Sequence, residues 1–241
     1  MKILSAMAAG VALVIVLCAS GAEPLKQEPA EPERRLVISG FEPFGGRKVN
    51  TSLLVAQAVV RTVVEMRQAA LPVEVPVIWG VPRRVVEGEG ERGWRLWVAF
   101  GEGGPGAFRI EARAFNRRKP IPDNQQRIAT ETEIRKGGEA VLTNPFPVRA
   151  LAELLREQGV AVEVSGDAGG YLCEELYYEL LTARAGRENC VVLFIHVPRL
   201  GSALGKGGAG AGSGLMDEAA IVDFAGKLLP AIEKIRAGGE R

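Results

Sequence analysis

The chain has 241 residues, of which 47% are hydrophobic, and 30 basic residues against 29 acidic ones leave a formal net charge of +1. This length and apolar fraction suit one folded domain with a real core. The balance of charge gives no electrostatic reason to expect a nucleic acid or an anionic membrane as partner. Short basic runs such as Arg83–Arg84 and Arg117–Lys119 are interpreted as solvated surface.

The first residues are predicted to be a secretory signal. Lys2 precedes the apolar run Ala6–Leu17, and small residues follow at Ala19–Ala22, which is the order of a signal peptide. The run is shorter than the about 20 residues that span a bilayer. We therefore expect a signal peptide over residues 1–22, export to the periplasm or the medium, and no other membrane association. A lipid-modified Cys18 and an uncleaved N-terminal anchor stay open as alternatives.

Residues 23–34 are rich in Pro and Glu, which predicts a disordered linker. The folded domain is then expected over residues 35–241. The chain has three cysteines, and after Cys18 has left with the signal, Cys173 and Cys190 can form a disulfide or remain as one reactive and one buried thiol. Because Cys190 begins an apolar strand, we expect its thiol to be inert and to lie apart from Cys173.

Within this domain, predicted strands alternate with predicted helices. Apolar or alternating runs predict strands over residues 35–39, 73–79, 95–100, 108–115, 160–164 and 190–196. Helical spacing of apolar residues predicts helices over 51–67, 149–158, 173–184 and 217–235. This order predicts an α/β fold: a single domain with three layers, α/β/α, around a central, twisted, mostly parallel sheet.

Reactive and aromatic side chains are expected at one edge of this sheet. His196 ends one predicted strand, and Phe41 and Glu102 follow two others. Cys173 opens a helix after the loop that follows another strand. Ligands of such sheets bind beyond the carboxyl ends of the strands, so we expect these residues to meet there.

Two glycine-rich stretches do not support a nucleotide site. Gly101–Gly106 fits G-x-G-x-x-G, but a strand-like run follows where a helix should begin. Gly201–Lys206 is one residue short of a phosphate loop, and the wider stretch Gly201–Gly214 is predicted to be a flexible surface loop. With one histidine in the chain and no close pair of cysteines, we expect neither a cofactor nor a metal.

Nucleophilic catalysis is better supported. A glycine-containing loop, Ala168–Leu172, leads to Cys173 at a predicted helix start, where partial positive charge and free N–H groups favour a thiolate and can hold an oxyanion. His196 is the only histidine and thus the only imidazole base available to the thiol. A third group should orient the imidazole, and the pattern alone does not select it. A buried structural cysteine and a histidine with only local hydrogen bonds stay open as the alternative.

Four blocks of sequence resemble motifs of the pyroglutamyl peptidase I family, in the family's order and at close to its spacing. They are Gly40–Gly46 with Asn50 and Ser52, Ile110–Asn116 followed by Ile121–Asn124, Ser165–Cys173, and Phe194–Pro198. The resemblance implies a cofactor-free cysteine peptidase that releases N-terminal 5-oxoproline from peptides. It implies Cys173 as nucleophile, His196 as base and Glu111 as the acid that orients the imidazole.

The same resemblance implies the substrate-binding residues. Phe41, Phe44 and Ile121 would pack around the lactam ring of the substrate. Tyr171 and Leu172 would offer backbone groups to the lactam amide.

Some positions depart from the family's pattern. Glu102 stands where the family has Gln, Pro120 where it has Arg, and Glu174 where Asn follows the nucleophile. Glu174 is expected to bring a negative charge beside the thiol. An inactive relative that binds pyroglutamyl peptides or another small ligand, and a hydrolase with shifted specificity, therefore stay open, and a homo-oligomer is neither required nor excluded.

Overall fold

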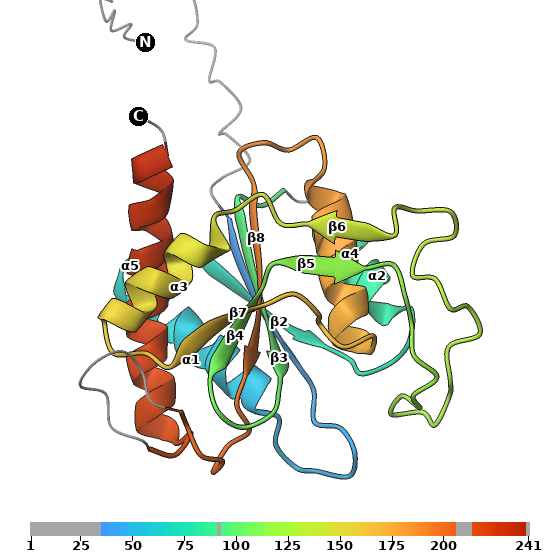
Figure 1. Cartoon of the computed structure of the whole chain (residues 1–241), viewed down its shortest axis with the longest axis horizontal. Coiled ribbons are helices and arrows are strands. Elements are labelled where there is room, and N and C mark those ends of the chain that lie inside the picture. Colours follow the sequence, from blue (N-terminus) through green and yellow to red (C-terminus); the bar gives the residue numbers. More distant parts are fainter. Residues whose placement is uncertain (1–34, 91–92, 206–213, 240–241) are drawn as a thin grey trace, which may run out of the picture. The chain divides into compact units, whose positions relative to one another are not determined.

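The computed structural model describes residues 35–90, 93–205 and 214–239 (Figure 1). The predicted signal peptide (1–22), the linker (23–34) and the middle of the glycine-rich stretch (206–213) lie outside these residues. They therefore remain predictions. The described part of the chain contains no helix that is both long and apolar enough to cross a membrane.

A six-stranded sheet forms the centre of the domain, in the order β2-β1-β3-β8-β4-β7. Its strands are β1 (Leu36–Phe41), β2 (Ala70–Val75), β3 (Leu96–Glu102), β4 (Phe108–Glu111), β7 (Val162–Ser165) and β8 (Val191–Val197). Strands β2, β1, β3 and β8 are parallel to one another. Strand β4 pairs antiparallel with β8 and parallel with β7. The mostly parallel sheet expected from the sequence is confirmed, with a reversed pair of strands at one edge.

Helices cover both faces of the sheet, so the domain has three layers (Figure 1). One face carries α1 (Thr51–Glu65), α3 (Val148–Glu157) and α5 (Glu218–Gly239). The other carries α2 (Val81–Gly90), α4 (Leu172–Arg184) and a small antiparallel pair, β5 (Arg113–Phe115) with β6 (Val141–Thr143). The predicted three-layer α/β/α architecture is therefore confirmed.

The alternation of side chains along each strand divides the core into two clusters. In β8, Ile195 and Val197 pack on the side of α1 and α5, whereas Val192 and Phe194 pack on the side of α4. Successive strand residues point to opposite faces. His196 therefore projects from the same face as Phe194, toward α4.

Two predicted strands end differently from the prediction. The strand expected over 73–79 stops at Val75 because Pro76 follows, and the Val77 N–H donates instead to the Glu42 carboxylate at 2.8 Å. The strand expected over 108–115 divides at Ala112 into β4 and β5. The sequence did not predict α2, because Pro82 and two glycines weaken its helical pattern.

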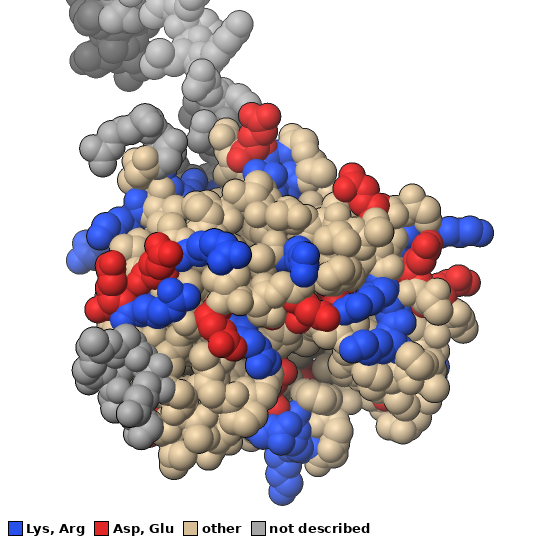
Figure 2. All heavy atoms as spheres, viewed as in Figure 1, with Lys and Arg blue, Asp and Glu red and all other residues tan. Residues whose placement is uncertain are grey.

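Arginines interpreted as solvated surface instead neutralise buried carboxylates on α4. Glu175 is fully buried and accepts from Arg118 Nε at 3.0 Å. Glu179 is fully buried and accepts from Arg83 Nε at 3.0 Å and from Arg135 Nε at 2.9 Å. The surface interpretation of Arg83 and Arg118 is therefore wrong, because a buried carboxylate is stable only when it is paired. Elsewhere on the face drawn in Figure 2, acidic and basic side chains are interspersed.

Candidate active site

Cys173 lies in the first turn of α4, after a glycine turn. Gly169 and Gly170 have φ values of 101° and 80°, a conformation that glycine adopts without steric cost. Tyr171, the N-cap residue, makes no side-chain hydrogen bond to the helix backbone. The N–H groups of the first turn therefore lack an intrahelical acceptor and carry the partial positive charge of the helix N-terminus beside the thiol.

The His196 imidazole lies beside the Cys173 thiol, which contributes to raising the pKa of the imidazole. Both side chains line the same cavity, and both crowd over Gly101 at the carboxyl end of β3. A Cβ at Gly101 would lie 2.8 Å from Cys173 Sγ and 3.1 Å from His196 Cδ2. The cysteine and the histidine singled out in the sequence are thus brought together, over a residue that has no side chain.

Glu111, the last residue of β4, contacts the other nitrogen of the imidazole. His196 Nδ1 lies 2.7 Å from Glu111 Oε1, and Glu111 is fully buried. Burial alone would lower the pKa of His196, but hydrogen bonds and negative charge from Cys173 and Glu111 outweigh burial and raise this pKa to about 9. At neutral pH the site therefore favours an imidazolium between two acidic groups.

The strand that precedes Cys173 does not end at the edge of the sheet where the site lies, which differs from the prediction. Strand β7 runs opposite to β8, because β4 is antiparallel to β8 and β7 is parallel to β4. The end of β7 at Ser165 therefore does not share the edge at which β1, β3 and β8 end. The loop over residues 166–171 returns the chain to that edge, at the bottom of Figure 1.

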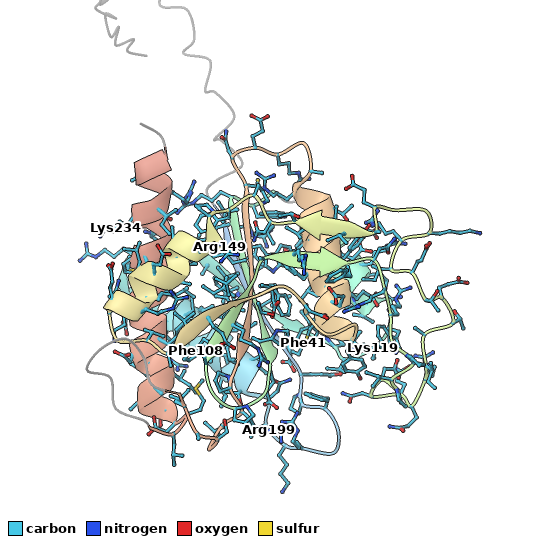
Figure 3. The ribbon with its side chains drawn as sticks, viewed as in Figure 1. Phe41, Phe108, Lys119, Arg149, Arg199 and Lys234 are labelled. Carbon is cyan, nitrogen blue, oxygen red and sulfur yellow. The ribbon has the colours of Figure 1, made fainter. Side chains whose placement is uncertain are left out.

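A cavity of about 170 Å³ lies beside the thiol. The predicted substrate-binding residues that line it are Phe41, Phe44, Tyr171 and Leu172. Val77 and Ala168 complete an apolar wall. Val77 was not predicted as a site residue, because its only signal in the sequence is a short apolar run. Such a cavity suits a flat, uncharged ring with a few polar atoms. Phe41 is labelled in Figure 3, above Arg199.

Ile121 is not among the residues that line this cavity, so its contact with a bound ring stays a prediction. Its side chain is 39% exposed, and its carbonyl accepts from the Trp79 indole N–H at 3.0 Å. The Trp79 ring packs edge-on against Tyr171, with the ring centroids 5.2 Å apart. Ile121 thus supports the wall through its backbone carbonyl, which holds the Trp79 ring.

Hydrogen bonds from Asn50 and Ser52 hold the loop after β1. Ser52 Oγ accepts from the Phe41 N–H at 3.0 Å. Asn50 caps α1 by accepting from the Ser52 N–H at 3.0 Å, and its amide donates to the Glu42 carbonyl at 2.8 Å. These contacts explain why Asn and Ser follow the Phe-Glu-Pro-Phe segment: they fix the aromatic wall to the start of a helix.

The Glu102 carboxylate, which stands where the family has Gln, is neutralised within the site. One oxygen accepts from the Thr51 N–H and hydroxyl, each at 3.0 Å. The other accepts from Arg47, and from Arg199 Nε at 3.3 Å. Burial alone would raise the pKa of Glu102, but these hydrogen bonds hold the pKa below its ordinary value. The carboxylate therefore stays ionised and paired at the amino end of α1.

Glu174 follows the cysteine in sequence, but its carboxylate has partners of its own in the protein. It accepts from the Phe115 N–H at 2.8 Å and from the Gly170 N–H at 3.0 Å, and Arg117 Nε lies 3.8 Å away. Burial raises the pKa of Glu174. The effect of a negative charge beside the thiol stays a prediction, and the structure adds that this side chain ties the glycine turn to β5.

Cys190 lies apart from Cys173, as expected, and both are free. Its Sγ donates to the Trp94 carbonyl at 2.9 Å, just before β8 begins, whereas His196 lies near the other end of that strand. Burial raises the pKa of Cys190, which makes it a poor nucleophile. In the part of the chain that the structure describes, no three His, Cys, Asp or Glu side chains gather to hold a metal ion.

We expect Gly101→Ala to lower kcat/KM by about 10²-fold, the size of effect that a displacement of about 1 Å can have in an active site. The new methyl group would lie 2.8 Å from the thiol sulfur and 3.0 Å from Phe194 Cζ, so the thiol and the imidazole must move apart. Gly88→Ala is the matched control, because a Cβ there meets nothing within 4 Å. Unchanged steady-state kinetics in Gly101→Ala would contradict this geometry.

Comparison with known proteins gives a consistent result over most of the domain. The family described as pyroglutamyl peptidase matches residues 34–224. A pyrrolidone-carboxylate peptidase of Lactobacillus acidophilus is 32% identical over 178 residues, which cover 72% of this chain and 88% of the relative. One from Klebsiella pneumoniae is 31% identical, covering 68% of this chain and 78% of the relative.

Solved structures show the same fold. The pyrrolidone carboxyl peptidase of Fervidobacterium islandicum is 27% identical with a TM-score of 0.61, covering 70% of this chain and 82% of that one. The pyroglutamyl peptidase I of Bacillus amyloliquefaciens is 26% identical with a TM-score of 0.61, covering 70% and 81%. From its matched length and the identity of its relatives, the chain belongs to the pyroglutamyl peptidase family.

Proposed function

We propose that this protein is a cysteine peptidase that removes an N-terminal pyroglutamyl residue, 5-oxoproline, from peptides. The observation that carries the proposal is the order thiol, imidazole and buried carboxylate beside a small apolar cavity at a helix N-terminus. Membership of the pyroglutamyl peptidase family supports the same conclusion. No cofactor is needed for this chemistry, because the protein supplies nucleophile, acid and base.

In the first half of the reaction, Cys173 Sγ attacks the carbonyl carbon of the pyroglutamyl residue. The carbonyl oxygen gains negative charge, which first-turn N–H groups of α4 stabilise. His196 donates its proton to the nitrogen of the leaving peptide, and the C–N bond breaks. A pyroglutamyl thioester remains on Cys173.

In the second half, His196 accepts a proton from a water molecule that attacks the thioester carbon. The C–S bond breaks, pyroglutamic acid leaves, and the proton returns to the sulfur–imidazole pair. Glu111 holds His196 Nδ1 at 2.7 Å, so that Nε2 stays directed at the reacting atoms and the imidazolium is stabilised each time it forms.

The cavity would select the lactam over an open N-terminus. A pyroglutamyl ring is neutral and flat, whereas an ordinary N-terminal residue carries an ammonium whose burial against Phe41, Phe44 and Val77 would cost several kcal/mol. The one carboxylate in the lining outside the catalytic groups, Glu102, is already paired with Arg47 and Arg199. It therefore offers little compensation to an ammonium.

The test is the release of a fluorescent amine from pyroglutamyl, glutaminyl and prolyl amides by the purified protein with reductant. We expect turnover of the pyroglutamyl amide, with the other two at least about 10²-fold slower. Iodoacetamide should abolish the activity, and a saturating pyroglutamyl product should protect against it.

The other outcomes separate the alternatives. Binding of a pyroglutamyl ligand without turnover would identify an inactive relative. Turnover of glutaminyl or prolyl amides in preference to the pyroglutamyl one would identify a hydrolase with shifted specificity.

A further inference from the structure

Arg109 on β4 is directed across the strand that carries the catalytic imidazole. It lies directly opposite His196 in the β4–β8 register, so the two side chains leave the same face of the sheet. A Cβ at Gly103, just beyond β3, would lie 2.6 Å from Arg109 Nη2 and 3.1 Å from His196 Cβ. Because β8 lies between β4 and β3, the guanidinium crosses β8 to reach this position.

The guanidinium has no partner there. The Arg109 side chain makes no hydrogen bond or ion pair with any residue of the described ranges 35–90, 93–205 and 214–239. Glu163, its register partner on the opposite side in β7, is exposed and forms no ion pair with it. The acids of the site are engaged elsewhere, Glu102 with Arg47 and Glu111 with His196. A partly buried cation is thus left unpaired beside the catalytic groups.

The position of this cation matches that of the leaving group. A general acid must lie next to the nitrogen that it protonates, so the leaving peptide lies on the His196 side of the thiol, away from the aromatic cavity. Arg109 is on that side. Gly101 and Gly103 point to the same face, one under the Cys173 sulfur and the other under the Arg109 guanidinium.

The distances also agree. Two residues of a strand span about 7 Å. The Cys173 sulfur over Gly101 and the Arg109 guanidinium over Gly103 are therefore about this distance apart. A carboxylate on the first leaving residue lies about 4 Å from the scissile carbon along the C–N, N–Cα and Cα–C bonds. The scissile carbon itself approaches the sulfur to about 3–3.5 Å. The α-carboxylate of a dipeptide, or a short acidic side chain, therefore reaches the guanidinium.

We propose that Arg109 binds a carboxylate on the residue that follows the pyroglutamyl group, so that the enzyme favours substrates whose leaving residue is acidic or ends the peptide. This inference rests on the proposed peptidase function. The chemistry is an Arg–carboxylate ion pair in a partly buried position, which a guanidinium makes with two parallel hydrogen bonds.

The experiment compares matched substrates that differ by one charge. Pyroglutamyl-alanine against pyroglutamyl-alaninamide tests the α-carboxylate. The α-amide of pyroglutamyl-glutamic acid, whose side-chain carboxylate is free, against the α-amide of pyroglutamyl-glutamine tests an acidic side chain. We expect the charged member of at least one pair to have a kcat/KM about tenfold higher. The ratio should fall to about one in Arg109→Gln and recover in part in Arg109→Lys. Arg61→Gln, at an exposed arginine of α1, should keep the wild-type ratio.

Calorimetry of the same ligands on Cys173→Ala separates this inference from the proposed function. If the wild type cleaves these substrates without a charge preference, or Arg109→Gln keeps the preference, the Arg109 proposal is overturned and the peptidase function stands. If nothing is cleaved, but the charged ligand binds more tightly to Cys173→Ala and loses this advantage with Arg109→Gln, the proposal stands and the peptidase function fails. No binding and no cleavage would overturn both.

Discussion

Cys173→Ala should lose at least about 10³-fold of its kcat on a pyroglutamyl amide, because no other group can form the acyl-enzyme. Among the described residues that line the cavity beside His196, Cys173 has the only thiol. This thiol needs both the imidazole and the helix N-terminus. The substitution leaves the backbone of α4 unchanged, so the thermal unfolding temperature should stay within a few degrees of wild type. Single-turnover and steady-state assays on the purified variant measure the loss.

Cys190→Ala is the matched control for this prediction. Its thiol donates to the Trp94 carbonyl before β8 and contributes nothing to the cavity lining. Activity should therefore survive in Cys190→Ala. Full turnover by Cys173→Ala, with Cys190 intact, would remove the thiol from the mechanism.

Glu111→Gln should lower kcat/KM by about 10²-fold or more and move its alkaline limb to lower pH. The hydrogen bond to His196 can persist, but the buried negative charge is lost, and with it part of the stabilisation of the imidazolium. In the wild type the activity should fall as pH rises through about 9, where His196 loses the proton that the leaving amine needs. In the variant this fall should begin at least about one pH unit earlier.

Folding stability should follow the same titration. The pKa of His196 is raised in the folded protein from 6.5 to about 9. The stabilising contribution of this proton is therefore complete below pH 6.5 and is lost as pH rises through about 9. Glu111→Gln should reduce that loss, as urea unfolding at pH 6 and pH 9.5 can measure. Glu153→Gln, at an exposed carboxylate of α3, is the control, and an alkaline limb that does not move in Glu111→Gln would contradict the assigned pair.

Local patterns predicted much of the site. A glycine turn before Cys173 and a single histidine at a strand end marked the two reacting side chains. The motif resemblance added Glu111 and the aromatic wall. These features could be found because a helix start, a strand end and a glycine turn each depend on residues close together in the chain.

The sequence did not predict the partners of polar side chains when those partners lie far along the chain. The sequence placed Glu174 next to the thiol, and only the fold shows that its carboxylate bonds to the backbone of Phe115 and Gly170. Arg118 looked like solvated surface, yet it neutralises Glu175. A buried carboxylate needs a hydrogen-bonding or cationic partner. Which residue is that partner depends on the tertiary structure, because the partner comes from a distant part of the chain.

By itself, the sequence determined the alternation of strands and helices, the reactive cysteine at a helix start and the histidine that serves it, because these follow from hydrophobic periodicity and local turn chemistry. The tertiary structure alone decided that β4 and β7 run opposite to the other four strands of the sheet, that Ile121 is partly exposed and absent from the cavity lining, and that the Arg109 side chain crosses β8 without a partner among the described residues. Strand direction and the aim of a long side chain depend on pairings between distant segments, and no local pattern encodes them.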